Sequence, residues 1–244
     1  MYSLKPDCIS SPYIFKLKTS FWYSIFLATI SSSALCEERN NNLVSSIFLE
    51  YQPDYSYRGV VLENLDSVDY GIEISHLGLS AGIEEVDLDD VDNFTAYFLS
   101  YSYNFNVLNI SVGFQNNDPI LKSKEIFIEA ISQVNETLEA KVSYFHRIDH
   151  DSSDYIEFQL SRPWVSRAGQ WMAKPYALIS AGDYYSDGFS FNHFEVGSDI
   201  TYRLTAHLYL SAYGAVVLPL ESVKDAGFES DIKVSGGLVL RYTF

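Results

Sequence analysis

The chain ends on the sequence IKVSGGLVLRYTF, residues 232–244, in which two kinds of side chain alternate. The even-numbered positions hold Ile, Val, Gly, Leu, Leu, Tyr and Phe, whereas Lys233, Ser235 and Arg241 stand at odd-numbered positions. Successive side chains of a β-strand point to opposite faces of the sheet, so this period of two predicts a strand with one apolar and one polar face. The alternation also runs longer than the roughly five or six residues of an average strand in a soluble protein.

The same alternation recurs upstream. Residues 95–105 place Thr, Tyr, Leu, Tyr, Tyr and Phe at odd positions, and similar patterns cover residues 108–115, 138–147 and 207–218. About ten alternating residues is the length that a tilted strand needs to cross a bilayer. We therefore predict an all-β fold, a transmembrane antiparallel up-and-down β-barrel of about 12 strands. The predicted strands lie near residues 43–52, 69–76, 79–86, 94–104, 107–116, 124–133, 137–148, 154–162, 173–183, 190–203, 206–218 and 230–244.

Short and long connections alternate along this pattern. Tight turns are predicted at residues 76–78, 104–106, 135–136 and 204–205. Longer polar loops are predicted near residues 53–68, 87–93, 117–123, 149–153, 184–189 and 219–229. Short turns on one side and long loops on the other are typical of an outer-membrane barrel. The stretch 162–171 breaks the rule, because a short turn is expected there and the connection is long.

The first 36 residues predict a secretory signal peptide. Lysines precede an apolar run at residues 21–30, and Ser32 and Ala34 follow at the two small positions before a cut. One alternative is a membrane-anchoring helix, but the run is much shorter than the roughly 20 residues that a bilayer requires. The other is a lipoprotein attached at Cys36, which Leu35 disfavours because a small residue is wanted there. We expect a signal peptide over residues 1–36 and an outer-membrane β-barrel over residues 37–244, in the outer membrane of a diderm bacterium.

Composition excludes several classes of function. The 244 residues contain 16 Lys and Arg against 32 Asp and Glu, which gives a formal net charge of −16. So acidic a protein repels phosphate backbones, so nucleic acid is not an expected partner. The chain has two Cys and no Cys-x-x-Cys pair, which argues against a disulfide scaffold, a thiolate zinc site or a redox dithiol. No cofactor is expected.

The polar faces of the predicted strands must point into the barrel. A Lys or Arg on the lipid face at mid-bilayer costs roughly 2 to 4 kcal/mol. Two alternatives remain for the charged residues inside: they line an aqueous path that prefers cations, or they pair into salt bridges that plug the barrel. The candidate lumen-lining residues are Glu50, Glu73, Glu84, Glu125, Glu129, Glu139, Lys141, Arg147, Glu157, Glu195, Asp199, Arg203, Lys233 and Arg241.

One short motif is similar to a known family. The segment Tyr55-Ser56-Tyr57-Arg58-Gly59-Val60 resembles the Tyr-x-aromatic-Arg-Gly motif near the start of the TorF family of porins, and residues 139–144 and 154–157 are similar to its later strands. The resemblance implies an outer-membrane barrel with a passive transport role and no catalytic residues. From the residues themselves, Gly59 suits a tight bend where the first strand leaves the membrane. Arg58 would stack on Tyr55 and Tyr57, or pair, at that rim.

The last residues also resemble a signal. A terminal Phe244 with apolar Tyr242 on the same face is similar to the C-terminal signature that the outer-membrane barrel assembly machinery recognises. The alternative is an ordinary closing strand of a soluble sheet. The expected partners are therefore outer-membrane lipid, the assembly machinery and small solutes.

Two further candidate sites are weaker. His150-Asp151-Ser152 faintly resembles the His-x-Ser signature of outer-membrane phospholipases, but the segment is predicted as a polar loop and the family's later Asn is missing. The loop residues Asp87, Asp89, Asp90 and Asp92 could offer carboxylate oxygens to a hard cation, although a solvated acidic loop is favoured.

These observations favour a passive porin for small solutes with a preference for cations, and no enzymatic activity. The alternative is a closed structural or adhesive barrel, and a lipid-modifying enzyme is a distant third. The barrel is expected to be monomeric or weakly oligomeric.

Overall fold

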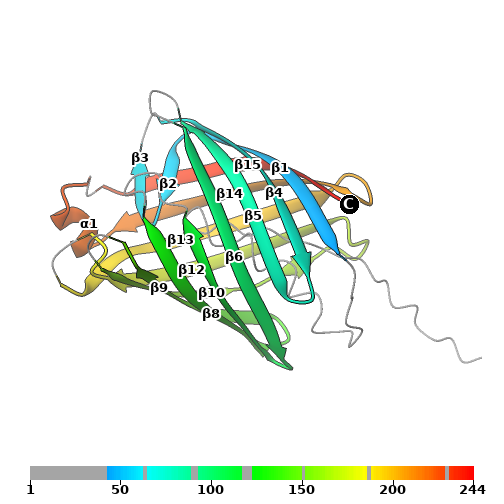
Figure 1. The fold of residues 1–244 in the computed structure, drawn as a ribbon. Coiled ribbons are helices and arrows are strands. Elements are labelled where there is room, and N and C mark those ends of the chain that lie inside the picture. Colours follow the sequence, from blue (N-terminus) through cyan, green and yellow to red (C-terminus); the bar gives the residue numbers. More distant parts are fainter. Residues whose placement is uncertain are drawn as a thin grey trace, which may run out of the picture.

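The computed structural model describes residues 43–62, 65–88, 93–116, 123–149, 152–185, 188–228 and 231–244. The predicted signal peptide, residues 1–36, lies outside these ranges. Twelve long strands form a closed barrel (Figure 1). They are β1 (Val44–Gln52), β4 (Ser67–His76), β5 (Leu79–Leu88), β6 (Phe94–Phe105), β7 (Leu108–Asn116), β8 (Lys124–Asn135), β9 (Leu138–Arg147), β10 (Asp154–Ser161), β12 (Trp171–Gly182), β13 (Ser190–Arg203), β14 (Leu208–Pro219) and β15 (Lys233–Thr243).

The barrel is antiparallel throughout and has no open edge. β1 lies between β4 and β15, so the first and last strands of the chain close the sheet. The second join pairs β10 with β12, and the remaining strands pair with their neighbours in sequence. A closed barrel satisfies every strand's backbone hydrogen-bonding groups within the sheet, which a lipid environment requires. The predicted fold class and strand number are confirmed.

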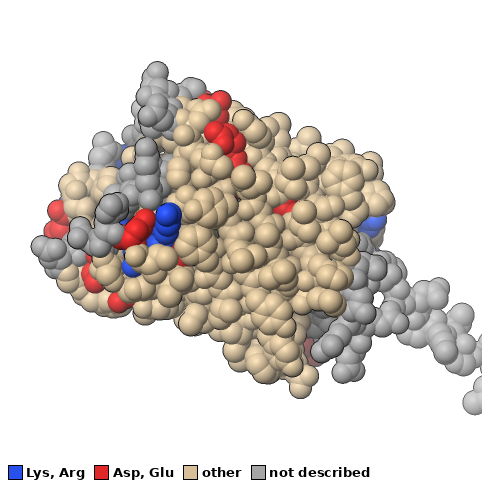
Figure 2. Space-filling model, in the orientation of Figure 1, with Lys and Arg blue, Asp and Glu red and all other residues tan. Residues whose placement is uncertain are grey.

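The outer wall is apolar and the inner wall is polar. On β1, the side chains of Ile47, Leu49 and Tyr51 are 44%, 49% and 43% exposed, whereas those of Ser46 and Glu50 are 2% and 0% exposed. Figure 2 shows the broad middle of one outer face almost free of charged side chains, which lie mostly at the left end, where α1 lies in Figure 1, and along the upper edge. This apolar wall suits contact with lipid.

Two connections differ from expectation. The long stretch after β10 contains a short strand, β11 (Trp164–Val165), which pairs with Ala173 and Met172 of β12. It therefore extends one hairpin and leaves the count of barrel strands unchanged. The predicted loop near residues 219–229 contains a helix, α1 (Glu221–Asp225). Within the described ranges, no helix has both the length and the apolar character needed to cross a membrane.

The predicted first loop contains a separate two-stranded sheet. β2 (Tyr55–Tyr57) pairs with β3 (Val60–Leu62), and this hairpin is not part of the barrel's ladder. It lies at the end of the barrel that carries α1, opposite the C-terminus (Figure 1). We call this end the long-loop mouth.

Candidate functional site

The β2–β3 hairpin turns through two residues with positive φ. Arg58 has φ of 47° and Gly59 has φ of 85°, and such mirror-image turns match the twist of a two-residue hairpin. A Cβ atom at Gly59 would overlap the imidazole ring of His193 on β13. Glycine is therefore required at this position both by the backbone conformation and by the close approach of the barrel wall.

The hairpin is folded into the lumen. Tyr55, Tyr57 and Arg58 are 0%, 1% and 0% exposed, which a surface loop would not allow. The two tyrosines belong to an apolar cluster with inward-facing residues of five barrel strands and with Tyr184, which follows β12: Val86, Leu88, Phe94, Ala96, Phe127, Phe145 and Tyr155. The predicted tight bend at Gly59 is present, and it lies in a hairpin whose tyrosine side chains are buried inside the barrel.

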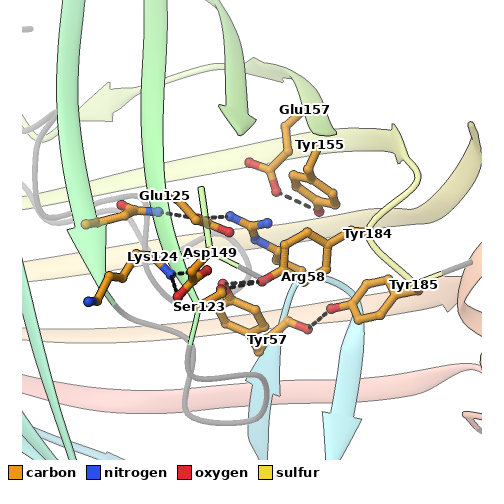
Figure 3. A network of polar contacts seen from close by, with 11 residues as sticks. Tyr57, Arg58, Ser123, Lys124, Glu125, Asp149, Tyr155, Glu157, Tyr184 and Tyr185 are labelled. Atoms are coloured by element: carbon orange, nitrogen blue, oxygen red, sulfur yellow. Dashed lines mark hydrogen bonds and ion pairs between the residues drawn. The ribbon is translucent and has the colours of Figure 1, made fainter. Parts of the chain in front are cut away.

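Arg58 at the hairpin tip contacts the opposite wall. Its guanidinium forms an ion pair with the carboxylate of Glu125 on β8 (Figure 3). Oε2 of Glu125 also accepts a hydrogen bond of 2.9 Å from the side-chain amide of Gln115 on β7. Since the side chains of Arg58 and Glu125 are both 0% exposed, each charge depends on the other for compensation.

Aromatic rings surround the same guanidinium. Its central carbon lies 4.3 Å from the ring centroid of Tyr184, 4.5 Å from that of Tyr155 and 4.9 Å from that of Phe145. The hairpin contributes a fourth ring, Tyr57, at 5.3 Å. Cations are attracted to aromatic faces within about 6 Å, and more strongly when water is excluded. We call the four wall and loop residues Glu125, Phe145, Tyr155 and Tyr184 the cage.

Hydrogen bonds hold the cage in place. The hydroxyl of Tyr155 donates to Glu157 at 3.0 Å, and the hydroxyls of Tyr184 and Ser123 lie 3.0 Å apart. The hydroxyl of Tyr185 donates to the backbone carbonyl of Tyr57 at 3.3 Å, so the segment after β12 contacts the hairpin directly (Figure 3).

The rest of the lumen contains both signs of charge. Lys141 pairs with Glu129 at 3.3 Å, Lys174 with Glu139 at 2.5 Å, and Arg241 with Glu73 at 2.8 Å. Among the described residues, ten carboxylate side chains are buried against five cationic ones. The carboxylates are Glu50, Asp69, Glu73, Glu84, Glu125, Glu129, Glu139, Glu157, Glu195 and Asp199, and the cations are Arg58, Lys141, Lys174, Lys233 and Arg241.

The structure places the sequence candidates on the inner wall. Of the fourteen, twelve are buried, and Arg147 and Arg203 are half-buried. Sequence reasoning missed Asp69 and Lys174, although the parity of their strands would have found both. It also missed the cage aromatics Phe145 and Tyr155, whose inward parity carried the same signal.

Most of the acidic loop lies outside the described residues. Asp87 is exposed on the outward face of β5, and Asp89, Asp90 and Asp92 lie outside the described residues. In the described part of the chain, no group of three or more His, Cys, Asp or Glu side chains is arranged to hold a metal ion.

A polar cluster lies near the second weak candidate. His150 and Asp151 are outside the described residues, but Oγ of Ser152 lies 3.5 Å from Nε2 of His146, whose Nδ1 lies 2.8 Å from Asp154. The connectivity is that of a catalytic triad, yet the serine contact is at the limit of a hydrogen bond. Asp154 also accepts a 2.6 Å hydrogen bond from Tyr144. We interpret the cluster as a link between the loop and the ends of β9 and β10.

The C-terminal residues face outward. Tyr242 and Phe244 are 39% and 65% exposed, and their rings pack edge to face at 4.9 Å. The backbone N–H of Phe244 donates to the carbonyl of Ser45 at 2.9 Å, which joins the chain's end to the start of the barrel.

Comparison with family models and with curated protein sequences finds no match. Solved structures do match. A KdgM porin in complex with disordered oligogalacturonate is 13% identical with a TM-score of 0.54, over 82% of this chain and 99% of that one. The NanC porin is 7% identical with a TM-score of 0.51, over 81% and 98%. A bacterial polysaccharide outer membrane secretin is 11% identical with a TM-score of 0.50, over 85% and 100%.

The chain has the fold of an outer-membrane porin. At such low identity the likeness shows the architecture alone. Together with the apolar outer wall, the closed twelve-stranded barrel places the protein in the outer membrane.

Proposed function

We propose that the protein is a porin-like channel that passes small solutes and prefers cations, with the β2–β3 hairpin narrowing its long-loop mouth. The observation that carries the proposal is the burial of charge in the described part of the barrel, where fully buried carboxylates outnumber fully buried cations by ten to five. A low-dielectric wall focuses the field of such charges and raises the local concentration of counter-ions. A hydrolytic activity is not part of the proposal.

The charge excess also bears on the solute class. The KdgM structure contains oligogalacturonate, a chain of sugar carboxylates. A lumen with twice as many buried carboxylates as buried cations opposes the entry of a polyanion. We therefore propose cationic or neutral solutes for this chain.

The hairpin favours a second candidate, a closed structural or adhesive barrel. Its tyrosines fill the long-loop mouth together with the apolar cluster on the wall, and Arg58 is ion-paired rather than aimed at solvent. The two candidates differ in whether the mouth opens. Membership of the TorF family, the signal peptide and recognition by the assembly machinery remain proposals that rest on the sequence.

The test is the reversal potential of the purified protein in planar bilayers across a potassium chloride gradient. Glu129→Gln with Glu157→Gln removes two buried lumen carboxylates, and Glu136→Gln removes an exposed one from a short turn as the control. We expect a cation-selective potential that the lumen variant weakens and the control does not. The selectivity should fade toward molar salt, since screening acts over about 8 Å at physiological ionic strength and less above it. A chloride-selective potential would contradict the proposal, and silence would favour the closed barrel.

A further inference from the structure

The cage around Arg58 has the chemistry of a cation-binding site. One carboxylate and three aromatic faces converge on a guanidinium that is 0% exposed. Aromatic rings that surround a desolvated cation are a recurrent means of recognising organic cations. The carboxylate adds a planar acceptor that matches the fork of guanidinium N–H donors.

The cage belongs to the barrel and not to the hairpin. Glu125, Phe145 and Tyr155 lie on β8, β9 and β10, and Tyr184 follows β12. Its rings also pack against one another, since the centroids of Phe145 and Tyr155 lie 6.1 Å apart and those of Tyr155 and Tyr184 lie 6.0 Å apart. These residues would therefore stay together if the hairpin moved away.

The hairpin can leave without opening the barrel. β2 and β3 form their own two-stranded sheet, and the barrel's ladder runs from β4 to β1 and on to β15 without them. Its withdrawal would expose the carboxylate and the rings of Phe145 and Tyr155 at the long-loop mouth, beside Tyr184, whose ring Arg147 also contacts at 3.9 Å. A second carboxylate, that of Glu157, follows Tyr155 on the inward face of β10. It accepts a hydrogen bond of 3.0 Å from the hydroxyl of Tyr155.

We propose that the cage is a binding site for solutes that carry an alkylguanidinium group, and that Arg58 occupies it as an internal competitor until such a solute displaces it. The inference rests on the proposed channel function and names its substrate class. A ligand tethered by a short flexible segment acts at an effective concentration in the millimolar range. The solute must therefore compete with Arg58 in the intact protein, and removing the Arg58 side chain should make its binding stronger.

The experiment uses methylguanidinium as the probe on the folded full-length barrel. Arg58→Ala vacates the cage, and Arg58→Ala with Glu125→Gln vacates it and removes its charge. Arg167→Ala, which removes an exposed arginine between β11 and β12, is the matched control. Binding is measured by titration calorimetry in detergent and by block of the current in planar bilayers, and heat-modifiable migration on a gel verifies that each variant is folded.

We expect Arg58→Ala to bind methylguanidinium about tenfold more tightly than the wild type and Arg167→Ala to behave as the wild type. The Glu125→Gln double variant should lose about tenfold again. If Arg58→Ala does not fold, a variant with a Gly-Ser segment of equal length in place of residues 55–62 vacates the same cage. Equal binding by Arg58→Ala and by the double variant would overturn the inference. Glu125-dependent binding without any current would support the site and overturn the channel function.

Discussion

The guanidinium of Arg58, at the tip of a hairpin inside the barrel, forms an ion pair with the carboxylate of Glu125 on the opposite inner wall. This contact joins residues 67 positions apart in the sequence and ties the first long loop across the mouth of the lumen. It converts a loop that would be expected outside the barrel into part of its interior.

A cysteine on the hairpin should be protected from water-soluble reagents. Ser56 is 4% exposed, whereas Ala226 lies exposed in another long loop. With both native cysteines, Cys8 and Cys36, replaced by Ser, we expect Ser56→Cys to react much more slowly than Ala226→Cys with a charged maleimide on intact cells. Equal labelling rates would show that the hairpin is a surface loop.

Gly59→Ala should destabilise the barrel more than a matched glycine substitution. Gly227 has φ of 86°, close to the 85° of Gly59, but has open space where a Cβ atom would stand. Gly227→Ala should therefore cost about 1 kcal/mol for the left-handed backbone alone. Gly59→Ala adds overlap with His193, which should lower the stability by a further amount of about 1–3 kcal/mol.

The temperature at which the folded form disappears on a gel ranks these two variants. Combining Gly59→Ala with His193→Ala should recover part of the loss, because the clash is removed and only the backbone strain stays. If Gly59→Ala and Gly227→Ala lose the folded form at the same temperature, the hairpin tip does not pack closely on β13.

Much of this architecture follows from the period of two in the sequence. It assigns Glu125, Glu157 and Arg241 to the inner wall, because a charge on the lipid face is costly. The hairpin does not follow from periodicity, because three-residue strands are too short to show a period. The burial of Tyr55 and Tyr57 could not be predicted from the sequence either, since aromatic side chains suit a membrane rim as well as an interior.

The cage could not be predicted from the sequence for a different reason. Its members come from three strands and from one loop, and their convergence depends on barrel closure and on the register between β8, β9 and β10. The inward parity of Phe145 and Tyr155 was readable, but Tyr184 lies in a loop and has no parity to read. Its packing against Arg58 is a property of the folded mouth.

A lumen ion pair should show strong coupling. Nζ of Lys174 lies 2.5 Å from Oε1 of Glu139, with both side chains nearly buried. Lys174→Met leaves a buried carboxylate without this partner and should cost about 3 kcal/mol. Adding Glu139→Leu should restore most of that loss, and urea unfolding in lipid vesicles, followed by tryptophan fluorescence, measures the cycle. Additive effects of the two substitutions would mean that the pair is solvated.

Phe244 should matter for assembly rather than for stability. Its side chain, just after the end of β15, is 65% exposed, similar to the 67% of Val234 on β15. If the terminal residue is an assembly signal, Phe244→Ala should leave unassembled protein in cells, whereas Val234→Ala should assemble normally. Both should refold equally well into detergent, because both side chains contact lipid or detergent alike. Normal assembly of Phe244→Ala in cells would show that the terminal residue is not an assembly signal.

The central claim is that the β2–β3 hairpin narrows the long-loop mouth of a porin-like barrel. Single-channel conductance tests it most directly, in the wild type and in a variant whose residues 55–62 are replaced by a Gly-Ser segment of equal length. We predict small or rare conductance steps from the wild type and steps several-fold larger from the variant, because the apolar cluster loses Tyr55, Tyr57 and Leu62 and the cage loses Arg58. Equal conductance from the two folded proteins, or none from either, would contradict the claim.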